Sequence, residues 1–171
     1  ILPAQCDYFQ IVKGGGHGDY NLVVFAPSSI QELYELVVHA FNVADQYRNP
    51  VVILGDGYLG QMMEAVEFKD EEVINKVEKP WATVGTNMER EHNIVNSLSL
   101  IPEELEKFNF ERFEKYKAIE ENEALCEEFM MEDAEICVAA FGIASRVSKN
   151  AVLEARKQGI KVGLIRPITL W

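Results

Sequence analysis

Gly55, Gly57 and Gly60 have the spacing of a dinucleotide-binding turn, in the segment GDGYLG that follows the apolar run VVIL. That fingerprint also needs a long helix after the third glycine, and then a strand that ends in an acidic residue about 20 residues on. The pattern after Gly60 allows only a short helix, and the later segment NKVEKP is not a strand. We therefore interpret the segment as a tight turn at the carboxyl end of a parallel strand. Ligands of open α/β sheets bind at that edge, so Asp56 could face a site.

The segment KGGGHGDY begins at Lys13 and predicts a loop, because four glycines within residues 14–18 oppose regular structure. Successive backbone N–H groups at Gly15 and Gly16 could hold an anion, and His17 could donate a hydrogen bond or act as a base. The segment is not a Walker motif, since the lysine precedes the glycines and no Ser or Thr follows as required. An exposed flexible loop with a surface histidine is the alternative.

The remaining candidates for metal or nucleophile chemistry have no partners at suitable spacing. His39 and His92 lack a second His, Cys or acid at ligand spacing, so we interpret both as structural and predict no metal site. Cys6, Cys126 and Cys137 lack the C-x₂-C spacing of zinc or iron–sulfur sites, and we expect reduced thiols.

The clearest structural pattern is a strand, a long helix and a second strand. Residues 21–26, which are apolar from Leu22 onwards, and residues 51–54 have the continuous apolar pattern that is typical of parallel strands covered on both faces. Between them a helix is expected to begin at Ser29, with Ser29 and Glu32 as a capping box, and to end near Arg48. Its apolar stripe is Ile30, Leu33, Tyr34, Val37, Ala40, Phe41, Ala44 and Tyr47. This is a βαβ unit with parallel strands.

Other elements follow the same patterns. A short helix is expected over 7–13 with Asp7 as its cap, a helix over 88–98, and helical spacing over 103–131. Residues 134–142 predict a buried strand, 144–159 a helix that ends at Gly159, and 160–171 one strand to the last residue. The fold class is α/β, with parallel βαβ units in two domains joined by a helical acidic connector. The expected boundaries are 1–70, 71–133 and 134–171.

The net charge of −12 argues against nucleic acid or an anionic membrane as a partner. Residues 103–135 hold thirteen acids and four bases, which is typical of a solvated helical face. No apolar run is long enough to span a membrane. We expect a cytoplasmic protein, and, because the first residue is not Met, a piece of a longer chain.

Two long stretches together resemble a known family. Residues 3–68, which begin PAQCDYFQIVKGGGHGDYNLVVFAPSS, resemble the alpha subunit of 2-oxoacid:ferredoxin oxidoreductases. They are most similar to the 2-oxoisovalerate (3-methyl-2-oxobutanoate) type, with 2-oxoglutarate enzymes close behind. Residues 131–171, which begin MEDAEICVAAFGIASRVSKN, resemble the start of the second domain of that subunit. The resemblance implies a late part of a thiamine pyrimidine-type domain over 1–70 and the start of a transketolase C-terminal-like, Rossmann-like domain over 134–171.

The resemblance also implies an activity and partners. Such enzymes convert a 2-oxoacid, coenzyme A and oxidised ferredoxin to acyl-CoA, carbon dioxide and reduced ferredoxin. Thiamine diphosphate and magnesium are held mainly by a beta subunit, and iron–sulfur clusters lie on other subunits (delta and gamma). We expect this chain to bind none of them tightly alone, and to be inactive alone.

The same resemblance bears on individual residues. The thiamine-activating glutamate is expected upstream of Pro3, so no catalytic residue is assigned. Gln5, Cys6 and Asp7 and the loop Gly14 to Gly18 match stretches expected near the cofactor cleft. With Asp56, which the sheet edge indicates, the candidate cofactor-binding residues are Gln5, Asp7, Gly15, Gly16, His17 and Asp56.

Two alternatives stay open. One is the beta subunit of a lipoamide-linked 2-oxoacid dehydrogenase, or a transketolase relative, which has both domain types but a different acyl acceptor. The other is a non-catalytic α/β scaffold module. A co-purifying iron–sulfur subunit favours the ferredoxin enzyme, and a lipoyl protein favours the dehydrogenase.

Overall fold

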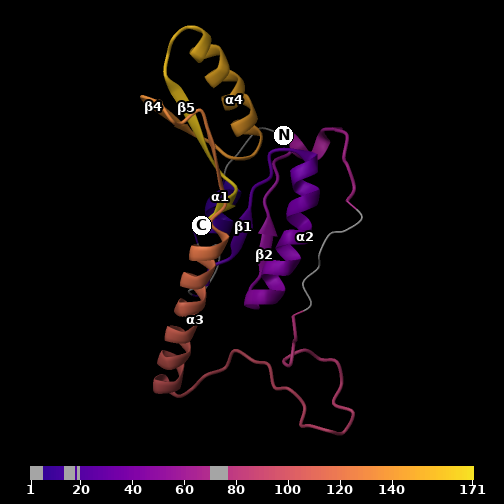
Figure 1. The fold of residues 1–171 in the computed structure, drawn as a ribbon. Coiled ribbons are helices and arrows are strands. Elements are labelled where there is room, and N and C mark those ends of the chain that lie inside the picture. The colour runs from indigo at the N-terminus through magenta and orange to yellow at the C-terminus, as the bar shows by residue number, and fades with distance from the viewer. Residues whose placement is uncertain (1–5, 14–17, 19, 70–76) are drawn as a thin grey trace.

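The structure is a computed structural model that describes residues 6–13, 18, 20–69 and 77–171. The described residues form two three-stranded sheets, four α-helices and one short 3-10 helix (Figure 1). Its elements are α1 (Cys6–Val12), β1 (Val23–Phe25), α2 (Ile30–Tyr47), β2 (Val51–Ile53), η1 (Leu59–Gln61), α3 (Pro102–Glu123), β3 (Cys126–Phe129), β4 (Ile136–Ala139), α4 (Gly142–Lys157), β5 (Val162–Pro167) and β6 (Thr169–Leu170).

The first sheet confirms the expected βαβ unit. β1 and β2 are parallel, with Val23 opposite Val51, and α2 connects them. The Ser29 side chain accepts a hydrogen bond from the Glu32 N–H at 3.1 Å, as the capping box predicts. The Glu32 carboxylate, however, turns to Ser28 instead of Ser29, so only half of the box forms.

The buried face of α2 differs from the predicted stripe. Leu36, Ala40 and Val43 are the buried residues, whereas Val37 and Phe41 are 38% and 66% exposed. The apolar residues of α2 therefore extend around more than one face. The core selects the face that packs on Val23 and Phe25.

Residues 77–101 have no regular secondary structure and form an extended loop that leads into the far end of α3 (Figure 1). The expected helix over 88–98 is wrong. Asn87 and Met88 have φ values of 49° and 63°, which end any right-handed helix at that point. Nearly all side chains of 88–98 are exposed, so the loop lacks the packing that stabilises a short helix.

The expected helix over 103–131 is confirmed only in part, because α3 ends at Glu123. The residues that follow form β3, which pairs antiparallel with β5. Pairing with a strand far along the chain here outweighs the local helical spacing. Tyr116 and Ile119 pack one stripe of α3 on the first core, while most of the acidic side chains are exposed.

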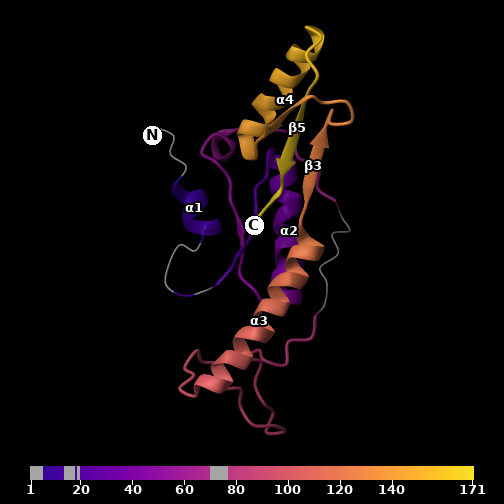
Figure 2. The same ribbon diagram turned by 90° about the vertical axis from the view of Figure 1, so that its left-hand side faces the viewer.

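The second sheet has the order β3-β5-β4, with β4 and β5 parallel and connected by α4. Figure 2 shows β3 beside β5, with α4 packed near them. Gly159, with φ 81°, follows the end of α4 as expected. The expectation that residues 134–142 form a buried strand is wrong about burial. β4 is an edge strand whose residues are mostly exposed, because the described chain covers only its α4 side.

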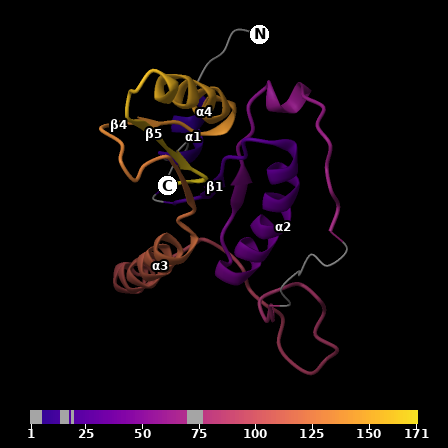
Figure 3. The same cartoon turned by 45° about the horizontal axis from the view of Figure 1, so that its top comes forward.

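The last segment does not run as one strand. It divides at Ile168, whose N–H donates to the Leu125 carbonyl at 2.9 Å, and β6 then pairs antiparallel with β1. The end of the chain therefore belongs to both sheets, and it joins the 134–171 segment to the first core. Figure 3 shows α4 beside β4 and β5, apart from α2.

Among the described residues, no helix is long and apolar enough to cross a bilayer. All three cysteines are free, as expected, and all three are exposed.

Candidate functional site

The carboxyl ends of β1 and β2 share one edge of the first sheet, which is where ligands of open α/β sheets bind. Asp56 lies just beyond β2 at this edge, and both of its carboxylate oxygens accept backbone hydrogen bonds. Oδ1 accepts from the Leu59 N–H at 2.9 Å, which caps the short helix η1. Oδ2 accepts from the Ile143 N–H at 2.9 Å, in the first turn of α4. Asp56 therefore joins the first sheet to the helix of the second.

Gly142 makes this contact possible. Its φ of +58° is a left-handed conformation, and a Cβ at this position would lie 3.1 Å from Asp56 Oδ2. The residue before it, Phe141, stacks on Tyr8 of α1 with ring centroids 5.6 Å apart. The sheet edge, α1 and the start of α4 thus meet at one place.

The N-terminus of α2, at the same edge, is also occupied by carboxylates of this chain. Glu32 Oε2 accepts from the Ser28 N–H at 2.7 Å, and Glu64 Oε2 accepts from the Ile30 N–H at 3.0 Å. The bond from Ile30, followed by that from Arg146, lowers the pKa of Glu64. Free N–H groups at a helix start are what would attract a phosphate. Here the first turns of α2 and α4 already donate to carboxylates of this chain.

Arg166 lies in β5 of the second sheet and pairs with two acids, Glu127 of the neighbouring strand β3 and Glu32 of α2, and the pair with Glu32 joins the second sheet to the helix of the first. Its guanidinium makes a bidentate pair with Glu32, at 2.9 and 2.8 Å, and its Nε donates to Glu127 at 2.6 Å. Only 5% of Arg166 is exposed. Burial by itself raises the pKa of Glu32, but the hydrogen bonds from Arg166 and Ser28 lower it overall. Burial likewise opposes the charge on Arg166, and the two carboxylates raise its pKa overall.

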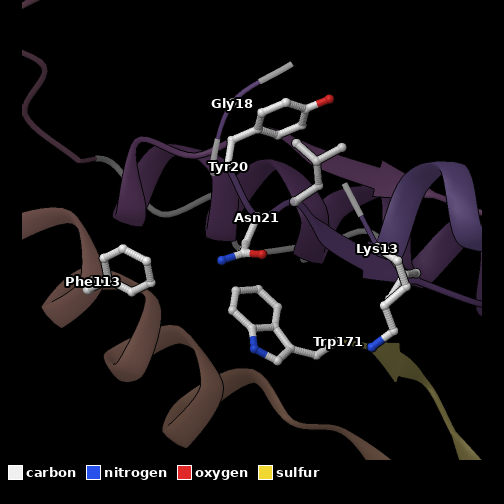
Figure 4. A pocket seen from close by; sticks show the side chains of 8 residues that line it. Lys13, Gly18, Tyr20, Asn21, Phe113 and Trp171 are labelled. Atoms are coloured by element: carbon white, nitrogen blue, oxygen red, sulfur yellow. The ribbon is translucent and has the colours of Figure 1, made fainter. Parts of the chain in front are cut away.

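A pocket of about 590 Å³ lies on the other side of the first core. Its lining residues are Val12, Lys13, Gly18, Tyr20, Asn21, Leu22, Phe113 and Trp171 (Figure 4). Three of them are aromatic and one is cationic. Figure 4 shows the Trp171 indole beside Asn21, with Phe113 across from it on α3. Two of the lining residues, Lys13 and Gly18, lie directly before and after residues 14–17 in the sequence.

The sequence-predicted site residues are only partly described. Gln5, Gly15, Gly16 and His17 lie outside the described residues. Asp7 lies in the first turn of α1 and not before it, so its expected role as the helix cap is wrong, and its side chain is exposed.

The two described histidines are consistent with structural roles. His39 packs on Phe25 with ring centroids 5.1 Å apart, and its Nε2 lies 3.2 Å from Glu123 Oε2 without the geometry of a hydrogen bond. His92 is exposed in the 77–101 loop, not in a helix. No group of three His, Cys, Asp or Glu side chains in the described residues could hold a metal ion.

The sequence predicted a role for Glu32 in the capping box, but it did not reveal the other charged residues of this contact, Arg166, Glu64 and Glu127. It also did not reveal the pocket. Arg166 could have been noticed as the one charge inside the apolar run VGLIRPITLW. Glu64 and Glu127 gave no signal, since each is an ordinary acid among others. The pocket joins segments from both ends of the chain, and no local pattern shows that.

Comparisons with known proteins agree along the whole chain. Residues 1–128 match the family model described as pyruvate flavodoxin/ferredoxin oxidoreductase, thiamine diphosphate-binding, and residues 134–171 match the pyruvate:ferredoxin oxidoreductase core domain II. The chain is 54% identical over 171 residues to the ketoisovalerate oxidoreductase subunit VorB of Methanothermobacter marburgensis, and equally to that of Methanothermobacter thermautotrophicus. It is 32% identical over 192 residues to the 2-oxoglutarate synthase subunit KorA of Methanocaldococcus jannaschii.

These matches cover all or nearly all of this chain but 48% and 52% of those relatives, so the chain spans about half of their length. Among solved structures, a 2-oxoglutarate:ferredoxin oxidoreductase from Magnetococcus marinus superposes with a TM-score of 0.71 and 21% identity, over 96% of this chain and 33% of that one. That likeness supports the fold.

Proposed function

Because the chain belongs to the pyruvate flavodoxin/ferredoxin oxidoreductase family, we propose that it forms part of a subunit of a thiamine-dependent 2-oxoacid:ferredoxin oxidoreductase. The observation that carries the proposal is the 54% identity to ketoisovalerate oxidoreductase subunits across all 171 residues. Identity to the 2-oxoglutarate relatives is 32% or less. The substrate is accordingly a branched-chain 2-oxoacid, converted with coenzyme A to acyl-CoA and carbon dioxide while ferredoxin is reduced. The cell compartment stays a prediction, namely the cytoplasm.

The described residues do not fit the diphosphate and magnesium of the cofactor. At the sheet edge, Asp56, Glu32 and Glu64 fill the helix N-termini, and a diphosphate there would meet like charge. The described residues also offer no group of metal ligands. We propose a division in which a beta subunit holds the diphosphate and magnesium, and iron–sulfur clusters lie on the delta and gamma subunits. The carboxylates at the starts of α2 and α4 support the first part of this division.

This chain contributes residues that form and position the walls of the cofactor cleft. The segment 1–70 supplies the late part of a pyrimidine-type domain, 71–133 the connector, and 134–171 the start of the second domain. Asp56 is better explained as a positioning residue than as a cofactor ligand, because Leu59 and Ile143 engage both of its oxygens. The glycine loop, with Gln5 and Asp7 before it, remains the segment proposed to border the cofactor cleft.

The complete enzyme, purified with its partner subunits, tests the function. Initial rates of ferredoxin reduction are measured with 2-oxoisovalerate, 2-oxoglutarate and pyruvate, each with coenzyme A. We expect kcat/KM to be highest for 2-oxoisovalerate. A preference for 2-oxoglutarate would overturn the branched-chain assignment. A requirement for lipoamide in place of ferredoxin would support the dehydrogenase alternative, and inactivity of the complete complex would support a scaffold.

His17 gives a separate prediction for the glycine loop. Replacing His17 with Ala in the complete enzyme should lower turnover about 100-fold if the imidazole donates or accepts a proton in the cleft. His92→Ala, in the exposed 77–101 loop, is the matched control and should leave kcat unchanged. Equal turnover rates for His17→Ala and the parent enzyme would instead support the alternative that this segment is an exposed surface loop.

A further inference from the structure

The N-terminal half of α3 exposes large apolar side chains. Leu105, Phe108, Phe110 and Phe113 are 42%, 58%, 68% and 53% exposed, although Tyr116, one turn further on, is buried in the first core. Figure 1 shows this half of the helix projecting beyond the sheet that covers its other end. Exposed apolar side chains mark an interaction surface when they adjoin. On α3, Phe110 and Phe113 are three residues apart and adjoin on one face, and Leu105 and Phe108 adjoin on another.

Four residues form a stripe along one face of this half: Glu106, Phe110, Phe113 and Lys117. Their spacing of four, three and four residues places them one above another on a helix. All four are exposed. Among the described residues, α3 makes an ion pair between Lys107 and Glu111 and a close contact between Glu123 and His39, and neither of these contacts involves the two charges of the stripe.

In reverse, the order of the stripe is base, aromatic, aromatic, acid. In an antiparallel pair of copies, each charge therefore meets the opposite charge and each aromatic ring meets an aromatic ring. We propose that this stripe docks against the same stripe of a second copy of the chain, with the two helices antiparallel. Phe110 then lies opposite Phe113 of the second copy, and Glu106 lies opposite Lys117 of the second copy. By symmetry each contact occurs twice, as an isologous two-fold interface requires. A parallel pair would instead oppose Glu106 to Glu106 and Lys117 to Lys117, which is unfavourable.

The wider charge pattern of α3 favours the same direction. Residues 103–111 contain four acids and one base, a net charge of −3, whereas residues 112–117 contain three bases and one acid, a net charge of +2. Antiparallel docking places each acidic part over the basic part of the other copy. A hollow of about 360 Å³ runs along this face, lined by Pro102, Leu105, Glu106, Asn109, Phe110 and Phe113. It gives an incoming aromatic ring a place to pack.

Charge exchange tests the proposal in the complete enzyme. The number of copies of this subunit per particle is measured by native mass spectrometry, and the dimer dissociation constant by dilution. Glu106→Lys and Lys117→Glu should each weaken the dimer about tenfold, because two attractive pairs become repulsive. Phe110→Ala should weaken it roughly a hundredfold through loss of two buried aromatic contacts.

Mixing two variants distinguishes the proposed Glu106–Lys117 pairing between copies from a general folding defect. A mixture of the Glu106→Lys and Lys117→Glu subunits should form mixed dimers with about the affinity of the parent, since each acid again meets a base. The double variant E106K/K117E should also dimerise normally. Glu111→Lys makes the same charge change away from the stripe and should leave the dimer unchanged, because its exposed pair with Lys107, at 3.9 Å, contributes little.

Two results would overturn the proposal. One is a parent enzyme with a single copy of this subunit, or a dimer that none of the stripe variants weakens. The other is a Glu106→Lys enzyme that loses a different subunit while it keeps both copies of this one, which would assign the face to that subunit. Because the readout is mass, either result is independent of whether the oxidoreductase activity is confirmed.

Discussion

The strands β1 and β4 are both short and apolar, and each has a parallel neighbour, but they differ in what covers them. Every residue of β1 is fully buried, between α2 on one side and the cluster around Leu170 on the other. In β4, Ile136 is 52% exposed, and α4 packs on one face only. A continuous apolar run therefore predicts that a strand needs cover on both faces. It does not predict which part of the protein supplies that cover.

The largest expected effect is the difference between two truncations in these strands. Phe25→Ala should destabilise the subunit by about 3–5 kcal/mol, because it removes a large side chain from a closed core. Ile136→Ala should cost less than about 1 kcal/mol, since the side chain is half exposed. Urea unfolding of the subunit measures both. Similar costs for the two variants would show that β4 is covered in solution, and a larger cost for Ile136→Ala in the complete enzyme would identify a partner as its cover.

The next effect concerns the contact between the sheets. Arg166→Ala should cost about 3 kcal/mol, because it leaves Glu32 and Glu127 without their shared cation in a partly buried place. Lys161→Ala is the matched control in the exposed pair with Glu135, at 2.9 Å, and should change stability by about 0.5 kcal/mol or less. Equal unfolding midpoints for the two variants would mean that the contact through Arg166 does not hold the sheets together.

A smaller effect is expected at the turn into α4. Gly142→Ala should cost about 1–3 kcal/mol, since it combines a left-handed backbone with a Cβ crowded against Asp56. Gly57→Ala is a suitable control, because nothing lies within 4 Å of its Cβ position and its φ is not in that region. Thermal unfolding of both variants checks this. A Gly142→Ala subunit as stable as Gly57→Ala would show that the start of α4 can move away from Asp56.

Local signals predicted much of the fold. The βαβ unit, the cap at Ser29 and the turn after β2 follow from chain-local patterns, and all are present. The turn at Gly55–Gly60 shows the limit of such patterns. Its letters match a dinucleotide fingerprint, but the helix that follows, η1, is a single short turn, and its N–H at Leu59 is capped by Asp56.

The features that sequence reasoning missed depend on contacts between distant segments. β3 forms because β5 is available as a partner, although residues 126–129 have helical spacing. β6 leaves the second sheet to pair with β1, about 145 residues away in sequence. Arg166 meets Glu32 across a separation of 134 residues. Neither residue propensity nor sequence spacing shows which distant segments pair. The contact between Arg166 and Glu32 could therefore be found only in the structure.

The pH dependence of stability gives the smallest and most specific prediction. Burial alone raises the pKa of Glu127, and the hydrogen bonds from Lys149 and Arg166 lower it below its usual 4.5, as also happens at Glu32. A carboxylate whose pKa is lower in the folded state adds stability that is present above the unfolded pKa. That stability is lost as the pH falls through the folded pKa. Stability should therefore be flat near neutral pH and decline below about pH 4.5.

The Arg166→Met subunit separates this contribution from general acid unfolding. Without the guanidinium, the pKa of Glu32 should rise, and stability should decline less steeply below pH 4.5 than in the parent. Urea midpoints measured from pH 3 to pH 7 in both proteins provide the comparison, and Ile136→Ala serves as a variant that leaves these carboxylates intact. If stability falls equally steeply with pH in Arg166→Met and in the parent, Glu32 and Glu127 do not govern the stability of the subunit at acid pH. In that case other surface carboxylates of this chain, which has a net charge of −12, would have to account for it.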